Sequence, residues 1–229
     1  AVARMVLEAG AKKVIVADNP INSPAGCFLK SGLKAVANEL DLELMYPEES
    51  AFTDLELDGE ILRHWPLFYR PFEQADKVIG IAPCKDHNLC SASMTMKNWY
   101  GLLGGRRNIF HQDIHTIIME LAMMVSPSLV ILDGTTTMMS NGPTGGSLSD
   151  LKQTSTMIVG TYQVAVDAFG ATLLEKTLND LPFIGMAEAA GIGTADYRSL
   201  NPVMATSKTM SMTGASRMSP YHFPTARWR

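Results

Sequence analysis

The stretch KVIGIA at residues 77–82 is a short run of apolar and β-branched residues, and the polar segment PCKDHNLCSASMTMKN (83–98) follows it directly. An apolar run without alternation is typical of a strand that is buried on both faces, as in a parallel sheet. A second such run, SLVILDG (128–134), comes after an amphipathic helical pattern at 114–125. We therefore predict two parallel strands joined by a helix.

The same alternation continues through most of the chain, although no element is predicted within residues 46–76. It predicts an α/β fold with a layered, mainly parallel sheet and helices on both faces, formed by a single domain over residues 1–203. In addition to the elements above, strands are expected at 13–18, 42–45 and 155–161, and helices at 2–10, 27–40 and 162–175.

Composition sets the limits within which a function must be sought. The chain has 229 residues and a net charge of −4, so its overall electrostatics argue against a nucleic-acid partner. No run of eighteen apolar residues predicts a membrane span, and no signal peptide is visible. Three cysteines give no disulfide framework, which favours a reducing compartment, and we expect a cytoplasmic protein.

The C-terminal segment differs from the rest of the chain. Residues 204–229 contain four basic residues, no acidic ones, two prolines and many Met, Ser and Thr. A segment of this composition buries little surface on its own, so we predict an extended tail. It could fold back over the domain, but we favour contact with a neighbouring subunit and therefore expect a homo-oligomer.

The functional site is predicted from the position of the polar loops. Ligands of open parallel sheets bind beyond the carboxyl ends of the strands, and polar loops follow three of the predicted strands, at 18–26, 83–98 and 133–146. A helix that follows a strand begins at the same edge. We therefore expect a shared cleft for a small-molecule ligand, with the residues Lys85, His87, Lys97 and His111 inside it and Asn141 on its rim.

Each candidate residue has a functional and a structural interpretation. His87 could move a proton and Lys97 could face a ligand, whereas a lysine between apolar residues could also extend its amine to solvent. His111 and His115 are four apart, which suits a metal site on one helix face, or they are ordinary histidines at a helix start. Cys84 and Cys90 lack metal-site spacing and are expected to be small buried thiols.

The loop SNGPTGG (140–146) matches neither common phosphate-binding motif. Its backbone N–H groups could approach an anion, or its glycines could serve only to make turns. The candidate ligand-binding residues of this region, together with the earlier loop, are Lys85, Asn98, Asn141, Gly142 and Gly145. Asp167 lies among apolar residues of a helix, so we expect its carboxylate to be paired or to cap a neighbouring loop.

The segments ADKVIGIAPCKDH, TMKNWYGLLGG, SLVILDGTTTMMSNGPTGG and YQVAVDAF occur in an order that resembles the domain of unknown function 362 family. The resemblance covers roughly residues 1–200. The family's opening strand is absent, as is the ferredoxin-like cysteine cluster of many relatives, so the chain carries no iron–sulfur motif and a ferredoxin-like protein becomes a possible partner. YQVAVD also replaces the family's Asp-Pro helix start.

The family is more distantly similar to the nickel-pincer lactate racemases. That similarity implies a nucleotide-derived cofactor or a divalent metal, nickel or iron, with His87, Lys97 and either His111 or His115 in the corresponding order. The expected function is a metal- or nucleotide-cofactor-dependent enzyme of redox or isomerase type that acts on a small polar metabolite. The alternatives are a non-catalytic redox or metal-handling accessory protein and a structural interaction subunit.

Overall fold

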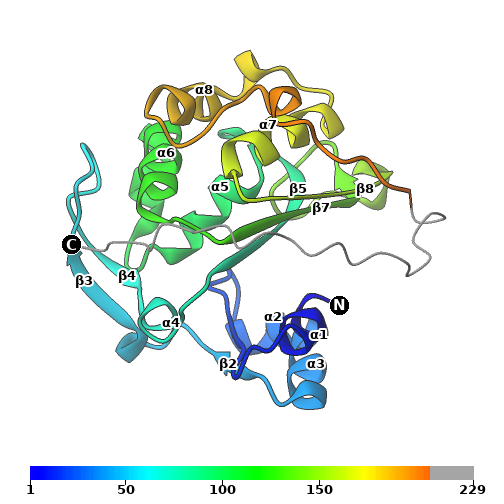
Figure 1. Ribbon diagram of the computed structural model, residues 1–229. Helices are drawn as coiled ribbons and strands as arrows, with labels where there is room; N and C mark the ends of the chain where they lie inside the picture. The colour runs from blue at the N-terminus through cyan, green and yellow to red at the C-terminus, as the bar shows by residue number, and fades with distance from the viewer. Residues whose placement is uncertain (207–229) are drawn as a thin grey trace.

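The computed structural model describes residues 1–206 and shows a mixed α/β protein (Figure 1). Most of the predicted tail, residues 207–229, lies outside the described residues, so its subunit contact stays a prediction. The described strands form one four-stranded and two two-stranded sheets. No helix among residues 1–206 has the length and apolar character that crossing a membrane requires.

The four-stranded sheet has the order β6-β5-β7-β8, with β5 at Ile79–His87, β6 at Ser91–Ser93, β7 at Leu129–Met138 and β8 at Leu151–Gly160. Strands β5 and β7 run parallel, with Ile81 opposite Ile131, which confirms the predicted β-α-β unit. Strands β6 and β8 are antiparallel to their neighbours, so the prediction of a mainly parallel sheet is wrong. The β7–β8 connection holds only a short 3-10 turn, and a parallel return needs a longer crossover.

Helices cover one face of this sheet (Figure 1). They are α5 (Thr95–Asn98), α6 (Ile114–Met124), α7 (Gln163–Leu173) and α8 (Pro182–Ala189). The apolar stripe predicted for α6 is buried, as expected, at Ile114, Ile118 and Leu121 and at Val125 just beyond its end. On the other face Ile81, Met157 and Val159 are 50–56% exposed, so the described residues do not cover both faces with helices.

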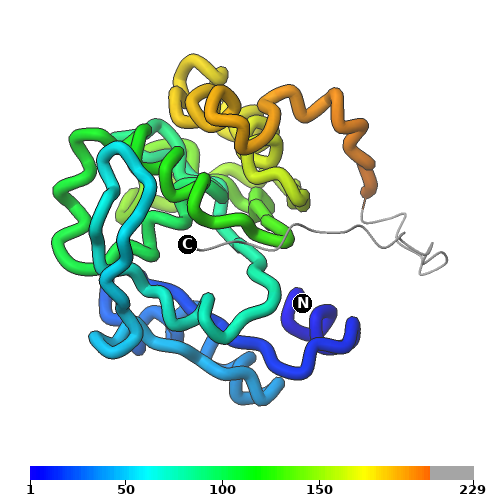
Figure 2. Tube along the Cα trace, turned by 60° about the vertical axis from the view of Figure 1, so that its left-hand side comes forward, coloured from blue at the N-terminus to red at the C-terminus, as the bar shows by residue number. Residues whose placement is uncertain are grey.

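The N-terminal residues form a separate small unit, with α1 at Val2–Glu8, β1 at Ile15–Ala17, α2 at Pro24–Lys30, α3 at Leu33–Leu40 and β2 at Glu43–Met45. It lies at the opposite end of the molecule from α7 and α8 (Figures 1 and 2). Strand β1 pairs in parallel with β2 and not with the main sheet. The single helix predicted at 27–40 is two helices, because Gly32 between them has φ +79°.

A β-hairpin occupies the region for which the sequence predicted no element. Strands β3 (Phe52–Glu56) and β4 (His64–Phe68) pair antiparallel, flanked by the 3-10 turn η1 (Glu49–Ala51) and the short helix α4 (Arg70–Glu73). The remaining 3-10 segments are η2 at Trp99–Leu102, η3 at Arg107–Asp113, η4 at Leu148–Asp150, η5 at Leu178–Asp180 and η6 at Tyr197–Leu200.

A buried carboxylate on α6 holds the hairpin connection in place. Glu120 accepts hydrogen bonds from three successive backbone N–H groups, those of Glu60 at 2.6 Å, Ile61 at 3.0 Å and Leu62 at 2.9 Å. Gly59 lies so close to this carboxylate that an added Cβ would be 2.5 Å from Glu120 Oε2. The hairpin is therefore bound to the helical layer by charge-assisted hydrogen bonds.

We expect Glu120→Ala to lower the free energy of unfolding by about 2–4 kcal/mol, because it leaves three backbone donors without their acceptor in a buried position. Glu39→Ala is the matched control, since Glu39 is an exposed helical glutamate in a surface ion pair with Arg4. That change should cost less than about 1 kcal/mol. Urea unfolding of both variants measures the difference, and equal losses would contradict the structural role of Glu120.

Candidate functional site

The segment predicted as a loop after residue 82 is mostly regular structure. Strand β5 continues to His87, a tight turn leads into β6, and α5 follows at once. Lys85 and His87 therefore lie on strand β5. Lys97 lies on α5, which the β5–β6 hairpin brings back next to the same sheet. This arrangement gives the three side chains fixed positions, which a long loop would not provide.

The Asp167 carboxylate caps α5 and so positions Lys97. One oxygen of Asp167 accepts hydrogen bonds from the N–H of Thr95 at 2.9 Å and from its hydroxyl at 2.5 Å, and the other accepts from the N–H of Met96 at 2.9 Å. Asp167 is fully buried, and this burial raises the pKa of its carboxyl group to about 6. The prediction that this carboxylate caps a neighbouring segment is confirmed.

Lys97 is buried with only 8% of its surface exposed, and its Nζ lies 3.7 Å from the centre of the Tyr100 ring. The His111 ring stacks on Tyr100 with 5.5 Å between ring centres. Burial, together with the positive charges of Arg107 and Lys85, lowers the pKa of the Lys97 amine to about 8.

His87 is held in a defined tautomer. Its ring is 6% exposed, and Nδ1 accepts a hydrogen bond of 3.1 Å from the N–H of Leu89. Burial, and then the charges of Lys97, His111 and Lys85, lower the pKa of His87 to about 4. The ring is therefore neutral at pH 7 with its proton on Nε2, which makes that nitrogen a hydrogen-bond donor.

His87 interacts electrostatically with Lys97, His111 and Lys85, so these four groups lie near one another; the shared cleft with Asn141 on its rim stays a prediction. Burial lowers the pKa values of Lys85 and His111 as well. Among residues 1–206, neither Lys85 nor Lys97 forms an ion pair within 4 Å. Of the four, His87 and Lys97 are buried, Lys85 is half-buried and His111 is exposed. Buried donors usually have an acceptor, and the described residues provide none for the Lys97 amine.

Sequence reasoning missed Arg107, which joins this cluster. Its guanidinium donates hydrogen bonds to the carbonyl oxygens of Asn19 at 3.2 Å and Gly101 at 3.4 Å. Asp18 interacts electrostatically with both Arg107 and Lys85, and it is the described carboxylate nearest in effect to these two positive charges. The Asn19 side chain also donates to Gly101, so the polar loop after β1 reaches the site from the N-terminal unit.

The glycine-rich loop is fastened to the end of β5. Asp86 accepts a hydrogen bond from Lys176 Nζ at 2.6 Å and one from the Gly142 N–H at 3.3 Å, while Asn88 N–H donates to the Gly142 carbonyl at 3.3 Å. A Cβ at Gly142 would lie 2.0 Å from the Asp86 carbonyl oxygen, so only glycine fits. The Gly142 amide is thus used within the protein and does not point to an external anion.

Other predicted ligand-binding residues have their own partners or none. Asn141 Nδ2 donates to Asp150 at 2.8 Å, and Asn98 Nδ2 donates to the Ile81 carbonyl at 3.4 Å. Gly145 adopts φ +85° and has open space around it. Cys84 and Cys90 are buried, which confirms the expectation of small buried thiols, and burial raises their pKa values to about 12 and about 11.

The two candidate metal ligands contact different aromatic rings. His111 lies in η3 and stacks on Tyr100, whereas His115 lies on α6 and stacks on Phe183 with 6.1 Å between ring centres. The i, i+4 argument assumed one continuous helix, but α6 begins only at Ile114. Residues 1–206 contain no group of three or more His, Cys, Asp or Glu side chains arranged to hold a metal ion. Their role as ligands stays a prediction.

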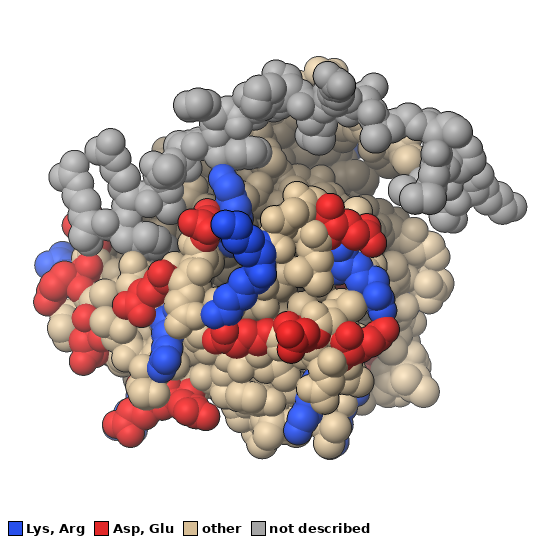
Figure 3. All heavy atoms as spheres, turned by 60° about the horizontal axis from the view of Figure 1, so that its bottom comes forward, with Lys and Arg blue, Asp and Glu red and all other residues tan. Residues whose placement is uncertain are grey.

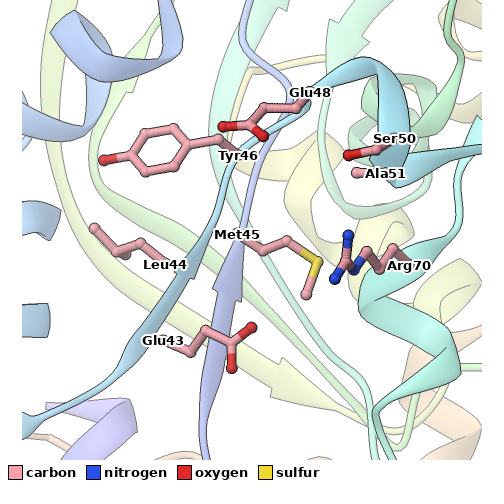
Figure 4. Close-up of a pocket in the computed structure, with 8 residues that line it drawn as sticks. All are labelled: Glu43, Leu44, Met45, Tyr46, Glu48, Ser50, Ala51 and Arg70. Atoms are coloured by element: carbon pink, nitrogen blue, oxygen red, sulfur yellow. The ribbon is translucent and has the colours of Figure 1, made fainter.

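Two hollows lie outside this cluster and share none of the predicted site residues. A small pocket of about 160 Å³ is lined by residues of β2 and η1 and by Arg70 of α4 (Figure 4). A larger one, of about 480 Å³, lies between α7, α8 and η6 and includes Lys176. On the face shown in Figure 3, acidic and basic side chains are interspersed, so this face presents no surface of a single charge.

We expect Lys176→Ala to lower the free energy of unfolding by about 1–3 kcal/mol, because it leaves the partly buried Asp86 without its cationic partner. Lys152→Ala removes a comparable but exposed pair with Glu175 and should cost less than about 1 kcal/mol. Chemical denaturation of the two variants makes the comparison. A larger loss for Lys152→Ala would show that the Asp86 contact does not fasten the loop.

A second prediction concerns acid stability. Because the folded-state pKa of His87 is about 4 and its ordinary value is 6.5, the unfolded chain takes up a proton between these limits while the folded chain does not. The contribution of His87 is therefore complete above pH 6.5 and is lost as pH falls towards 4. Relative to wild type, His87→Gln should lose about 1–2 kcal/mol less stability between pH 7 and pH 5.

Urea unfolding at both pH values tests this expectation, with His64→Gln as the control because His64 is exposed and paired only with Glu56. An identical pH dependence of wild type and His87→Gln would show that the folded protein does not keep His87 neutral.

Comparison with known proteins agrees with the order of the sequence motifs. The model of the family described as Domain of unknown function (DUF362) matches residues 1–172. The thylakoid-associated protein sll1697 of Synechocystis sp. is 24% identical over 213 residues, which make up 90% of this chain and 62% of that protein. The chain thus spans less than two thirds of the length of this relative. No solved structure matches the present chain.

Proposed function

The chain belongs to the domain of unknown function 362 family, and we propose that it is an enzyme that binds a small anionic metabolite or a nucleotide-derived, anionic cofactor beside Lys97. The observation that carries this proposal is the surplus of donors in the cluster. Among the described residues, Asp18 is the carboxylate that interacts with Lys85, while Asp86, which interacts with His87, is already paired with Lys176. A ligand with negatively charged oxygen atoms would supply the missing acceptors.

The donor set fits an anion better than it fits a metal. Protonated lysines are not metal ligands, and the described residues offer no group of three ligating side chains. A nucleotide-derived cofactor with phosphate or carboxylate groups would be held by Lys85 and Lys97 and would supply chemistry that amino acids lack. The order of His87, Lys97 and His111 resembles that of the lactate racemases, and this order alone supports such a cofactor here.

The reaction type that these residues support is proton transfer, as in an isomerase. With a pKa of about 8, the Lys97 amine can both accept and donate a proton near neutral pH. The neutral His87 ring suits the role of a hydrogen-bond donor to an oxygen on which negative charge develops, rather than that of the base. This proposal assigns the proton transfer to Lys97, whereas the sequence led us to expect it of His87.

We expect the purified chain to bind inorganic pyrophosphate, a compact probe for the anion site, and Lys85→Met to bind it at least about tenfold more weakly, because that variant removes one of the two lysine charges. Lys12→Met is the control, since Lys12 is an exposed lysine of the N-terminal unit. Isothermal titration calorimetry measures both affinities. Equal binding by the two variants, or no binding by wild type, would overturn the proposed anion site.

The identity of a resident cofactor can be examined in the same preparation. Absorption spectroscopy of the native protein, followed by mass spectrometry of the small molecules released on denaturation, should reveal an anionic compound that is absent from Lys97→Met. A non-catalytic accessory protein would instead carry metal without such a compound, and a structural subunit would carry neither.

A further inference from the structure

The Lys97 side chain is the most unusual group in the described part of the molecule. Its amine is buried against the Tyr100 ring, and no described carboxylate or carbonyl accepts a hydrogen bond from it. His115 Nδ1 is the one described side-chain nitrogen or oxygen that is both sealed from solvent and unpartnered. Lys97 Nζ, for which the described residues provide no hydrogen-bond acceptor, is not sealed in this way and keeps some contact with solvent.

The backbone that carries Lys97 is anchored at the start of α5. Asp167 fixes the first turn of α5 through Thr95 and Met96, directly before Lys97. The aromatic ring beneath Nζ is fixed in turn, because the Tyr100 hydroxyl donates a 2.6 Å hydrogen bond to the Arg107 carbonyl. A lysine whose backbone is anchored and whose amine is buried against a ring has less conformational freedom to lose on reacting than a surface lysine.

We propose that Lys97 is a nucleophile that forms a covalent imine with the carbonyl carbon of a small 2-oxo acid, whose carboxylate Lys85 binds. This inference rests on the proposed anion site and names its substrate class. Burial and neighbouring positive charges are the two conditions that leave a lysine amine unprotonated and nucleophilic near neutral pH. Both are present here, from the core below and from Lys85 and Arg107 beside it.

Imine formation needs no reactant other than the Lys97 amine and the 2-oxo acid. The unprotonated amine adds to the carbonyl carbon, so that a C–N bond forms while the C–O π electrons move to oxygen. That oxygen takes up protons and leaves as water, and the nitrogen loses its protons to give the neutral imine. The Nε2–H of His87 is a donor in the same cluster, suited to stabilising the negative charge that develops on the carbonyl oxygen.

Reductive trapping tests the proposal. The full chain is incubated with pyruvate and cyanoborohydride, and the modified lysine is located by peptide mass spectrometry. We expect one reduced pyruvate unit on Lys97, formed at least about tenfold faster than on any exposed lysine, and with a rate that rises around pH 8 and not pH 10. The adduct should be absent from Lys97→Met and unchanged in Lys30→Met, which alters an exposed lysine.

A variant that keeps the nucleophile guards against a folding defect in Lys97→Met. Lys85→Met removes a neighbouring positive charge, so the midpoint of the trapping rate should shift to higher pH, and pyruvate should be bound more weakly. Labelling spread over surface lysines, or an unshifted midpoint in Lys85→Met, contradicts the proposal. If pyrophosphate binds while no adduct forms on Lys97, the imine is excluded and the anion site stands; if neither is observed, both fall.

Discussion

The cap that Asp167 places on α5 is the interaction on which the arrangement of the site depends. A four-residue helix has no stability of its own, because nucleation costs more than so few hydrogen bonds return. Here a fully buried carboxylate from α7 binds its first N–H groups, and the low dielectric of the core makes these bonds strong while making the carboxylate costly to bury. The position of Lys97 is thus set by a group on a different helix.

A second buried carboxylate, Glu120, follows the same principle on the opposite side of the helical layer. Each of the two acids serves a run of consecutive backbone donors instead of a basic side chain. The lysines of the site are consequently not neutralised by the carboxylates nearest to the core. Neither acid forms an ion pair with Lys85 or Lys97 among the described residues.

Sequence periodicity predicted the parts of the fold that depend on local patterns. The parallel β5–β7 pair, the buried stripe of α6 and the capping role of Asp167 could all be derived from runs of apolar residues and from one acid among them. The grouping of Lys85, His87, Lys97 and His111 followed from the rule that strand ends and helix starts share an edge. The antiparallel direction of β8 could not be predicted from these patterns. It depends on the conformation of the short β7–β8 connection, which the periodicity of apolar residues does not encode.

The position of Arg107 and the β3–β4 hairpin could not be predicted from the sequence for a related reason. Arg107 joins the site through backbone carbonyls of a loop more than eighty positions away, and a contact of that kind leaves no mark on the residue types involved. The β3–β4 hairpin is secured by Glu120, which reads in the sequence as an ordinary polar position of an amphipathic helix. Proline and charged residues within 46–76 hid the strand pattern further.

The order of these contacts along the chain has a consequence for synthesis. The lysine cluster and its hairpin leave the ribosome well before Asp167 and Lys176, which hold them in place from 72 and 90 positions further on. Contacts of such long sequence separation form late, after the loop-closure entropy has been met. In the nascent chain Lys97 is therefore exposed and protonated, like any surface lysine, and it becomes buried only when α7 docks.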